Sequence, residues 1–302
     1  MLDTNDEWIT TRTGMKNRHI AGEHEATSDL AIAAARHALD NANIEASEID
    51  CFIVATSTPD YAFPATACLV ASALGAVGKP AFDMEIACSG FVYGISVAAS
   101  LVQAGIFRRV MLIGADKLSS VTDMTDRGTA ILFADGAGAV IVERSATDGL
   151  LGCELGADGR EPSLLYVPAG GTRRPLDQAG LEERAHCIRM QGREIFKHAV
   201  TKMVESTNAA FAQAGLTPSD CSYFIPHQAN GRIIDLVGKQ LGLSSERVLV
   251  NIAEYGNTSA ASIPITLSEA VARGDIKHGN ILAFSGFGGG LSWGTVVWRW
   301  EA

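Results

Sequence analysis

Apolar side chains recur at helical spacing along residues 28 to 42. The positions that share this face are Leu30, Ala33, Ala34, Ala38 and Leu39. We therefore predict a helix that begins at a Ser28/Asp29 cap and keeps His37 on its solvent side. A second helix, rich in small residues, is predicted for LVASALGA, beyond a proline-marked turn at residues 61 to 64.

Four β-rich runs alternate with helices in the first half of the chain. They read IDCFIVATST, PAFDMEI, RVMLIGAD and ILFADGAGAVIVER, and glycines in the last suit a bend or a close backbone approach. Between the second and third runs, SGFVYGISVAASLVQAG is typical of a helix that ends at Gly105. Strands that alternate with helices predict an α/β layered architecture.

The second half of the chain repeats this order. SYFIPHQAN parallels CFIVATSTP, RVLVNIAEYGNTSAASIPITLSEAVARG parallels PAFDMEIACSGFVYGISVAASLVQAG, and ILAFSGFGGGLSWGTVVWRW parallels ILFADGAGAVIVER. The offsets are 171, 169 and 152 residues (222 − 51, 257 − 88 and 288 − 136). We predict two pseudo-twofold-related halves, residues 1–145 and 146–302, with Asn257 in the place that Cys88 has in the first half. Residues 151 to 185, rich in Gly, Pro and charge, are predicted to form a surface loop or cap.

Composition narrows the function classes. A net charge of −10 argues against a protein that binds nucleic-acid phosphates, so an acidic partner would need a local basic patch. Six scattered cysteines without a C-x-x-C pair predict neither a zinc site nor a disulfide framework, and they fit a reducing cytoplasm. No run is long and apolar enough to cross a membrane, and the N-terminus lacks a signal-peptide pattern, so we expect a soluble cytoplasmic protein.

Three residues with the chemistry of nucleophilic catalysis each follow a strand-like run. Cys88 stands where PAFDMEI turns into a helix, His227 lies in YFIPHQAN, and Asn257 lies in EYGNTSAASIP. Sites of α/β proteins gather at such strand ends, and a thiol beside a helix N-terminus is expected to favour the thiolate.

Each of these residues also has an ordinary structural interpretation. Cys88 alone could be a small buried side chain, His227 a core or loop histidine, and Asn257 a turn or cap residue. The glycine runs at 136 to 138 and 288 to 290 could be bulges, and neither forms a dinucleotide-binding G-x-G-x-x-G loop. The order and contexts of the three residues together favour catalysis.

Six motifs carry a resemblance to a known family. ACSGFVYG, IPHQAN, YGNTSAASIP, TNDEWITTRTGMKNRHI, DRGTAILFADGAGA and GFGGGLSWG occur in order over almost the entire chain. The sequence resembles β-ketoacyl-acyl-carrier-protein synthase III, the initiating condensing enzyme of dissociated bacterial fatty acid synthesis. This implies a duplicated thiolase-like α/β fold in five α-β-α-β-α layers, and an acyltransferase that condenses a short acyl-CoA, most simply acetyl-CoA, with malonyl-acyl-carrier protein.

The resemblance implies roles for the three residues. Cys88 would take the acyl group from a thioester, and His227 and Asn257 would hydrogen-bond the malonyl carbonyl and hold the enolate that forms on loss of CO₂. The backbone N–H groups of Cys88 and Gly289 would form the oxyanion hole. No metal or resident cofactor is expected, because coenzyme A enters as the thioester substrate.

Further residues match positions that handle the substrate in the family. Trp8, Arg12, Arg127 and Asn230 would hold coenzyme A, although Asn230 could simply cap a helix. Phe63 would close the acyl pocket of a partner in a homodimer, or else be a core aromatic. A basic patch for the acidic carrier protein, alternatively a solvated face, comprises Arg193, Lys197, Arg232 and Lys239.

One departure from the family concerns the start of the chain. Members carry an additional N-terminal segment with the first strand of the first half, whereas only residues 1 to 3 precede the TNDEWI-like motif here. We expect that strand to lie inside a sheet, so that its absence leaves unpaired backbone groups and a gap in the core.

Other functions stay open at this point. A related condensing enzyme of specialised metabolism would share these motifs. A Cys/His/Asn hydrolase uses the same residue types but has a different fold and a C-G-x-C-W-like motif. A thiolase would need a second cysteine near the C-terminus, where the last cysteine here is Cys221. A non-catalytic acyl-binding relative would have no need of all three polar residues.

Overall fold

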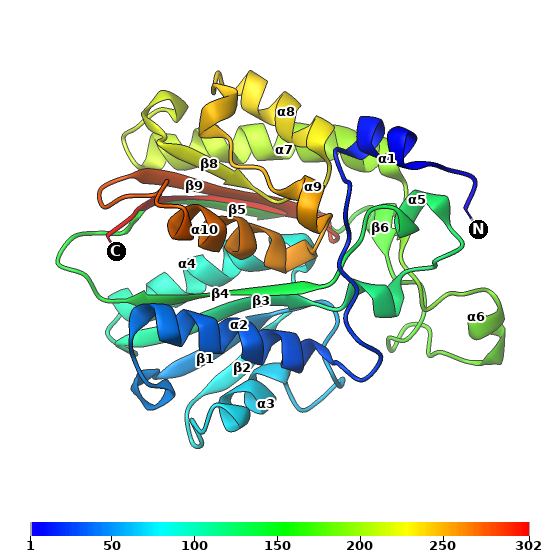
Figure 1. Cartoon of the computed structure of the whole chain (residues 1–302), viewed down its shortest axis with the longest axis horizontal. Helices are drawn as coiled ribbons and strands as arrows, with labels where there is room; N and C mark the ends of the chain where they lie inside the picture. The colour runs from blue at the N-terminus through cyan, green and yellow to red at the C-terminus, as the bar shows by residue number, and fades with distance from the viewer. Residues whose placement is uncertain (1, 302) are drawn as a thin grey trace.

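Two four-stranded sheets lie face to face in the computed structural model, which describes residues 2–301 (Figure 1). One helical layer separates the sheets, and further helices cover both outer faces. The predicted duplicated fold of five α-β-α-β-α layers is therefore confirmed.

Each sheet combines parallel strands with antiparallel ones. The first has the order β2-β1-β3-β4 and the second β5-β10-β9-β8, with β4, β5 and β10 antiparallel to their neighbours. The first sheet comprises β1 Cys51–Ala55, β2 Ala81–Met84, β3 Arg109–Asp116 and β4 Gly136–Glu143. The second comprises β5 Leu150–Ala157, β8 Tyr223–Pro226, β9 Ile281–Gly288 and β10 Ser292–Arg299. A small ribbon pairs β6 Leu165–Tyr166 with β7 Arg189–Met190.

Helices fill the three remaining layers. The first sheet is covered outside by α2 Thr27–Ala42 and α3 Thr66–Ala73, and the second by α7 Gly192–Gln213 and α8 Gly231–Gln240. The middle layer consists of α4 Gly90–Gln103 and α10 Ser262–Ala272. Shorter helices are α1 Asp6–Thr13, α5 Arg127–Ala130, α6 Gln178–Glu182 and α9 Ile252–Tyr255.

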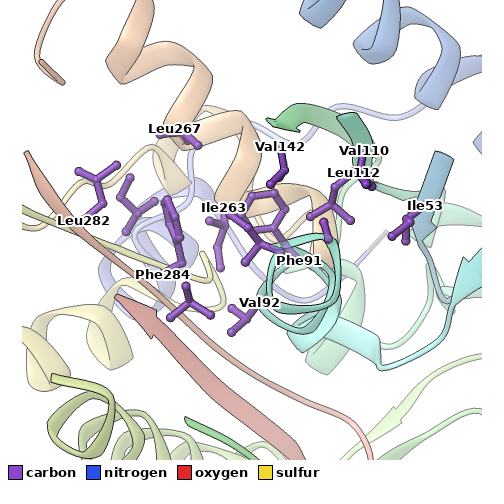
Figure 2. Packing of buried hydrophobic residues seen from close by; sticks show 14 of the residues in the cluster. Ile53, Phe91, Val92, Val110, Leu112, Val142, Ile263, Leu267, Leu282 and Phe284 are labelled. Carbon is purple, nitrogen blue, oxygen red and sulfur yellow. The ribbon is translucent and has the colours of Figure 1, made fainter. Parts of the chain in front are cut away.

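The middle helices are apolar on both faces because each contacts both sheets. Figure 2 shows Phe91 of α4 beside Ile263 of α10, with Phe284 of β9 next to them. The rings of Phe91 and Phe284 meet edge to face, 5.8 Å apart, and both side chains are fully buried. Burial of one such side chain stabilises the fold by about 1.5–3 kcal/mol, so this layer holds the two halves together.

A constant offset relates the halves and corrects one sequence prediction. β1 and β8 begin 172 residues apart (223 − 51), as do β3 and β9 (281 − 109). The short 3₁₀ turns Ala87–Ser89 and Ser259–Ala261, which precede α4 and α10, have the same offset (259 − 87). The counterpart of Cys88 is thus Ala260, and the prediction that Asn257 takes this place was wrong by three residues.

The two turns meet at the pseudo-twofold axis through small residues. A Cβ on Gly90 would lie 3.1 Å from the Cβ of Ala260, and one on Gly114 would lie 2.2 Å from the carbonyl oxygen of Ala260. Only glycine at position 114 lets β3 approach the second turn so closely. The N-termini of α4 and α10 therefore meet at one central place.

Other local predictions need correction. Residues 150–157 form strand β5, where a loop was predicted from residue 151 onward. Their backbone pairs with β10 in antiparallel register, and most of their side chains are small or apolar. In ILFADGAGAVIVER only Gly136–Glu143 is a strand. Helix α2 begins at Thr27, where Asp29 accepts from the Ala26 N–H at 2.8 Å, while the Ser28 hydroxyl donates to Asp60 and does not cap the helix.

Strand β4 forms one edge of the first sheet. The internal duplication shows which strand pairs at the equivalent position of the second sheet. In the second half β5 pairs with β10, the counterpart of β4, whereas no strand among residues 2–301 pairs with the outer edge of β4. A cavity of about 230 Å³ follows this edge between α2 and α10. The expected unpaired backbone groups and gap thus lie at an edge of the sheet and not in its interior, so the central strands stay intact.

Candidate active site

Cys88 lies in the first 3₁₀ turn, directly before helix α4, and is only 9% exposed. The preceding Ala87 has a left-handed backbone (φ 46°), which turns the chain sharply from β2 into the helix. The end of β9 passes against the cysteine, since a Cβ on Gly288 would come within 2.7 Å of the Cys88 nitrogen. The neighbouring Gly289 lies over Ala87 and Leu165.

Burial controls the protonation of this thiol. It raises the pKa of Cys88 to about 12, and the carboxylates of Asp116 and Glu85 add to the rise. A helix N-terminus does lie beside the sulfur, so burial and the helix end act on the thiol in opposite directions. The expectation that the helix end favours the thiolate stays a prediction, and burial opposes it.

His227 follows strand β8 and is almost fully buried. Its backbone N–H donates to the Ser285 carbonyl at 2.8 Å, which continues the β8–β9 ladder, and its Nδ1 lies 2.7 Å from the Ser262 hydroxyl. Burial lowers the pKa of His227 to about 4, so the imidazole is neutral at physiological pH.

The partners of Ser262 determine the tautomer of this histidine. The Ser262 oxygen accepts from the Gln228 N–H at 3.2 Å, a group that can only donate. Of these two neighbours, only Nδ1 of His227 can accept the hydroxyl proton. The ring proton is therefore on Nε2, which makes that atom a hydrogen-bond donor.

Asn257 lies on the loop before the second 3₁₀ turn, with its backbone tied to Leu132 and Ala134 at 2.9 Å each. Its Oδ1 accepts from the Ser259 N–H at 3.0 Å. Because this oxygen is engaged by a backbone donor, the orientation of the amide is determined and its NH₂ group is the donor side.

The turn at residues 259–262 brings the three candidate residues together. The Ser259 N–H holds Asn257, Ser262 holds His227, and the 3₁₀ turn that contains Cys88 packs against the turn Ser259–Ala261. Three residues separated by up to 169 positions (257 − 88) thus meet around one turn. Sequence reasoning missed Ser259 and Ser262 as site residues, although both lie in its GNTSAASIP motif; the left-handed backbone of Ser259 (φ 51°) has no local signal.

A buried carboxylate that the sequence did not single out lies beside this turn. Asp116, at the end of β3, is fully buried. Its Oδ1 accepts from the Ser57 N–H at 2.8 Å and from the hydroxyls of Thr58 and Thr56 at 3.0 and 3.2 Å. Its Oδ2 accepts from the Ala260 N–H at 3.4 Å. Burial raises the pKa of Asp116. One side chain thereby joins the two halves at the candidate nucleophile.

The predicted coenzyme A residues lie together at the molecular surface. The guanidinium groups of Arg127 and Arg12 lie 5.0 and 5.9 Å from the centre of the Trp8 ring, which is 38% exposed. Asn230 caps helix α8 through the Arg232 N–H at 2.9 Å, and its amide reaches the Arg12 carbonyl at 3.4 Å. The structure thus brings these four residues together at the surface. It also shows that Asn230 caps helix α8, the structural alternative predicted for this residue.

The remaining predicted residues are exposed. Phe63 is 87% exposed, so its interpretation as a core aromatic was wrong. The four basic residues lie exposed on α7 and α8, which pack together: Arg193, Lys197, Arg232 and Lys239. Lys197 donates to both carboxylate oxygens of Glu194 at 3.0 Å, which neutralises part of this patch.

Two classes of feature are missing from the part of the chain that the structure describes. Residues 2–301 contain no group of three or more His, Cys, Asp or Glu side chains arranged to hold a metal ion. Within the same range, none of the helices has the length and apolar character needed to span a membrane.

Two family models match the chain. The model described as 3-oxoacyl-[acyl-carrier-protein (ACP)] synthase III matches residues 82–159, and the model of its C-terminal part matches residues 211–300. A relative from Caldanaerobacter subterraneus subsp. tengcongensis, named β-ketoacyl-[acyl-carrier-protein] synthase III, is 48% identical over 302 residues. That alignment covers 100% of this chain and 91% of the relative.

Solved structures give the same result. The 3-oxoacyl-[acyl-carrier-protein] synthase III of Aquifex aeolicus VF5 is similar with a TM-score of 0.91 at 46% identity, over 99% of this chain and 92% of that one. A priming β-ketosynthase of a polyketide biosynthetic pathway has a TM-score of 0.92 at 34% identity, over 99% and 89%.

Proposed function

The chain belongs to the 3-oxoacyl-[acyl-carrier-protein] synthase III family, and on that premise we propose how its residues carry out the reaction. It is an acyltransferase, a condensing enzyme of fatty acid synthesis. We propose that it joins a short acyl-CoA, most simply acetyl-CoA, to malonyl-acyl-carrier protein, with 3-oxoacyl-carrier protein, CO₂ and coenzyme A as products. The observation that carries the proposal is the turn at residues 259–262, which holds His227 and Asn257 and packs against the turn that contains Cys88.

The first half-reaction transfers the acyl group to Cys88. A thiol attacks a thioester carbonyl, and one thioester replaces another, so the exchange costs little free energy. The developing oxyanion needs donors, for which we propose the backbone N–H groups of Cys88 and Gly289. The close passage of the β9 end over Cys88 supports this assignment, because it brings the glycine run beside the nucleophile.

The second half-reaction, in which the malonyl group loses CO₂ and condenses with the acyl group, requires hydrogen-bond donors but no additional positive charge. The Nε2–H of His227 and the NH₂ of Asn257 are the donor sides of two oriented side chains. We assign both to the malonyl thioester carbonyl, where they stabilise the enolate after decarboxylation. A neutral imidazole suits this task, because its hydrogen bond strengthens as the oxygen becomes negative without a proton transfer that would quench the enolate. Loss of one such donor costs about 3 kcal/mol of barrier.

Surface residues account for substrate delivery in the proposal. The Trp8 indole offers a face for the adenine ring, and Arg127 and Arg12 offer guanidinium groups for phosphates. Coenzyme A is then a substrate, and the reaction needs no resident cofactor. The basic residues of α7 and α8 would meet the acidic carrier protein. The exposure of Phe63 fits a homodimer in which this ring closes the partner's acyl pocket.

Intact-mass measurement after mixing with individual acyl-CoAs tests the proposal. We expect Cys88 to gain an acetyl mass and the acyl-enzyme to persist until malonyl-carrier protein is added, when the 3-oxoacyl product forms. Rapid release of free acid without a malonyl donor would instead indicate a hydrolase. Preference for a primer or extender outside the acetyl and malonyl pair would indicate specialised metabolism, as in the polyketide relative.

A further inference from the structure

Gln228 directly follows His227 in the IPHQAN motif, and neither half-reaction has given its side chain a role. This side chain is buried, with 1% of the residue exposed. Burial of a carboxamide costs free energy unless its donors and its acceptor are paired. The partners of the amide therefore indicate what Gln228 does.

The Gln228 amide joins the end of β8 to the segment that leads into α9. Its Nε2 donates to the Pro226 carbonyl at 2.8 Å and to the Leu249 carbonyl at 3.3 Å, and its Oε1 accepts from the Asn251 N–H at 3.1 Å. The opposite orientation would set the amide oxygen against two carbonyls, so these partners determine the orientation. Because the Leu249 N–H also donates to the Phe224 carbonyl at 2.9 Å, the amide continues a backbone pairing that begins on β8.

The backbone N–H of Gln228 contacts the residue that sets the tautomer of His227. It donates to the Ser262 hydroxyl oxygen at 3.2 Å, and the same hydroxyl lies 2.7 Å from Nδ1 of His227. Because that oxygen accepts the N–H, the hydroxyl proton is directed to Nδ1. A serine hydroxyl in a helix can otherwise donate to a backbone carbonyl, and Nδ1 would then be free to carry the ring proton.

The segment that Gln228 holds is also linked to helix α10. The Thr266 hydroxyl lies 2.8 Å from Oδ1 of Asn251 and 2.8 Å from the Ser262 carbonyl. Ser262 is the first residue of α10. Gln228 therefore connects the strand that leads to His227 with the helix end that carries Ser262 in two ways, directly through its N–H and indirectly through Asn251. Without the amide, three buried backbone groups would lose their partner and both connections would loosen.

We propose that Gln228 is a positioning residue that acts through Ser262 on His227 during decarboxylation of the malonyl group. Its amide keeps the Gln228 N–H on Ser262, and the ring proton of His227 therefore stays on Nε2, the donor side. This deepens the proposed function and rests on it, because the Nε2 donor matters only where an enolate forms. Acylation of Cys88 does not use that donor and is independent of Gln228.

A Gln228→Met variant tests the proposal, because methionine is similar in size and adaptable but has no amide. We expect CO₂ release from malonyl-carrier protein by pre-acetylated enzyme to fall about 10–100-fold, and acylation of Cys88 by acetyl-CoA to change less than about threefold. Thr207→Val is the matched control, since this fully buried residue of α7 loses its bonds to Met203 and Thr295 and should slow neither step. Equal CO₂ release by wild type and Gln228→Met would overturn the positioning role.

The tautomer of His227 provides a readout that loss of stability alone does not move. Long-range ¹H–¹⁵N NMR correlations distinguish a ring proton on Nε2 from one on Nδ1, and His227→Gln identifies the signal among seven histidines. Wild type and Thr207→Val should show the proton on Nε2, whereas Gln228→Met should shift it toward Nδ1. An unchanged tautomer in Gln228→Met would refute the proposed link.

Two further variants complete the test. Gln228→Glu keeps the size of the side chain and the acceptor for the Asn251 N–H, should lose CO₂ release to a similar extent, and serves if the methionine variant does not fold. In a Ser262→Ala background, Gln228→Met should slow CO₂ release by less than about threefold more, because both changes act on one imidazole. A full additional loss would show that Gln228 does not act through Ser262.

The NMR measurement keeps the two proposals distinguishable, because it needs no substrate. A wild type that has the His227 proton on Nε2 but releases no CO₂ from malonyl-carrier protein would refute the proposed function alone. A wild type that condenses normally, together with a Gln228→Met variant that retains both the tautomer and the rate, would refute the role of Gln228 alone.

Discussion

Acid should destabilise this protein through one buried imidazole, and the size of the effect follows from its surroundings. His227 is almost fully buried, and burial lowers its pKa from 6.5 to about 4. In the unfolded chain the ring takes up a proton near pH 6.5, whereas in the folded protein it stays neutral until about pH 4. Between these values the unfolded state binds more protons, so the free energy of unfolding falls as the pH falls.

The magnitude comes from the difference between the two pKa values. At roughly 1.4 kcal/mol per pKa unit, the stabilisation present above pH 6.5 and lost by pH 4 is about 3 kcal/mol. For a protein with a total stability of about 5–15 kcal/mol this is a large fraction. It also bears on the mechanism, because only a neutral ring can act as the Nε2 donor without adding charge.

Urea unfolding at several pH values between 4.5 and 7.5 measures this effect. We compare the wild type with His227→Gln, whose amide can bond Ser262 but does not titrate, and with His278→Gln, whose ring is exposed on the surface. The wild type and His278→Gln should lose about 2–3 kcal/mol more than His227→Gln over this range. Parallel pH curves for all three proteins would refute a buried neutral histidine.

Three further predictions concern other residues. Cys88→Ala should form no acyl-enzyme and no condensation product, and product at the normal rate would exclude Cys88 as the nucleophile. Gly114→Ala should lower the urea-derived stability by about 3 kcal/mol or more, because the new Cβ would lie 2.2 Å from the Ala260 oxygen; Gly159→Ala, with open space around it, should be near neutral, and equal losses would contradict the close approach. Arg127→Ala should raise the KM for acetyl-CoA about tenfold with kcat nearly unchanged, and an unchanged KM would remove Arg127 from the proposed coenzyme A site.

The local sequence predicted the elements that repeat most regularly. The strand RVMLIGAD is β3 as predicted, and the helix predicted for residues 28–42 differs from α2 in its bounds only at the first turn. Its buried face was partly wrong, because Ala31 and Ala35 are buried with Leu39 whereas Ala33 is exposed. Strand β5 was not predicted, because glycines and an acidic residue are typical of loops. These residues form a strand because their backbone pairs with β10. The prediction that Asn257 occupies the place of Cys88 was wrong, because similarity between short motifs cannot detect a shift of three residues. The backbone of the two 3₁₀ turns shows this shift.

The sequence by itself determined the class of fold and the family, and it singled out the three side chains that we propose for condensation. These follow from the order of apolar runs and from short motifs, which are local properties of the chain. Only the tertiary structure decided that one turn holds His227 and Asn257 beside the turn of Cys88, that Ser262 sets the tautomer of His227, and that burial raises the pKa of the thiol. Hydrogen-bond partners and desolvation depend on groups from other parts of the chain, up to 144 residues away for Asp116 and Ala260, and no local pattern encodes that environment.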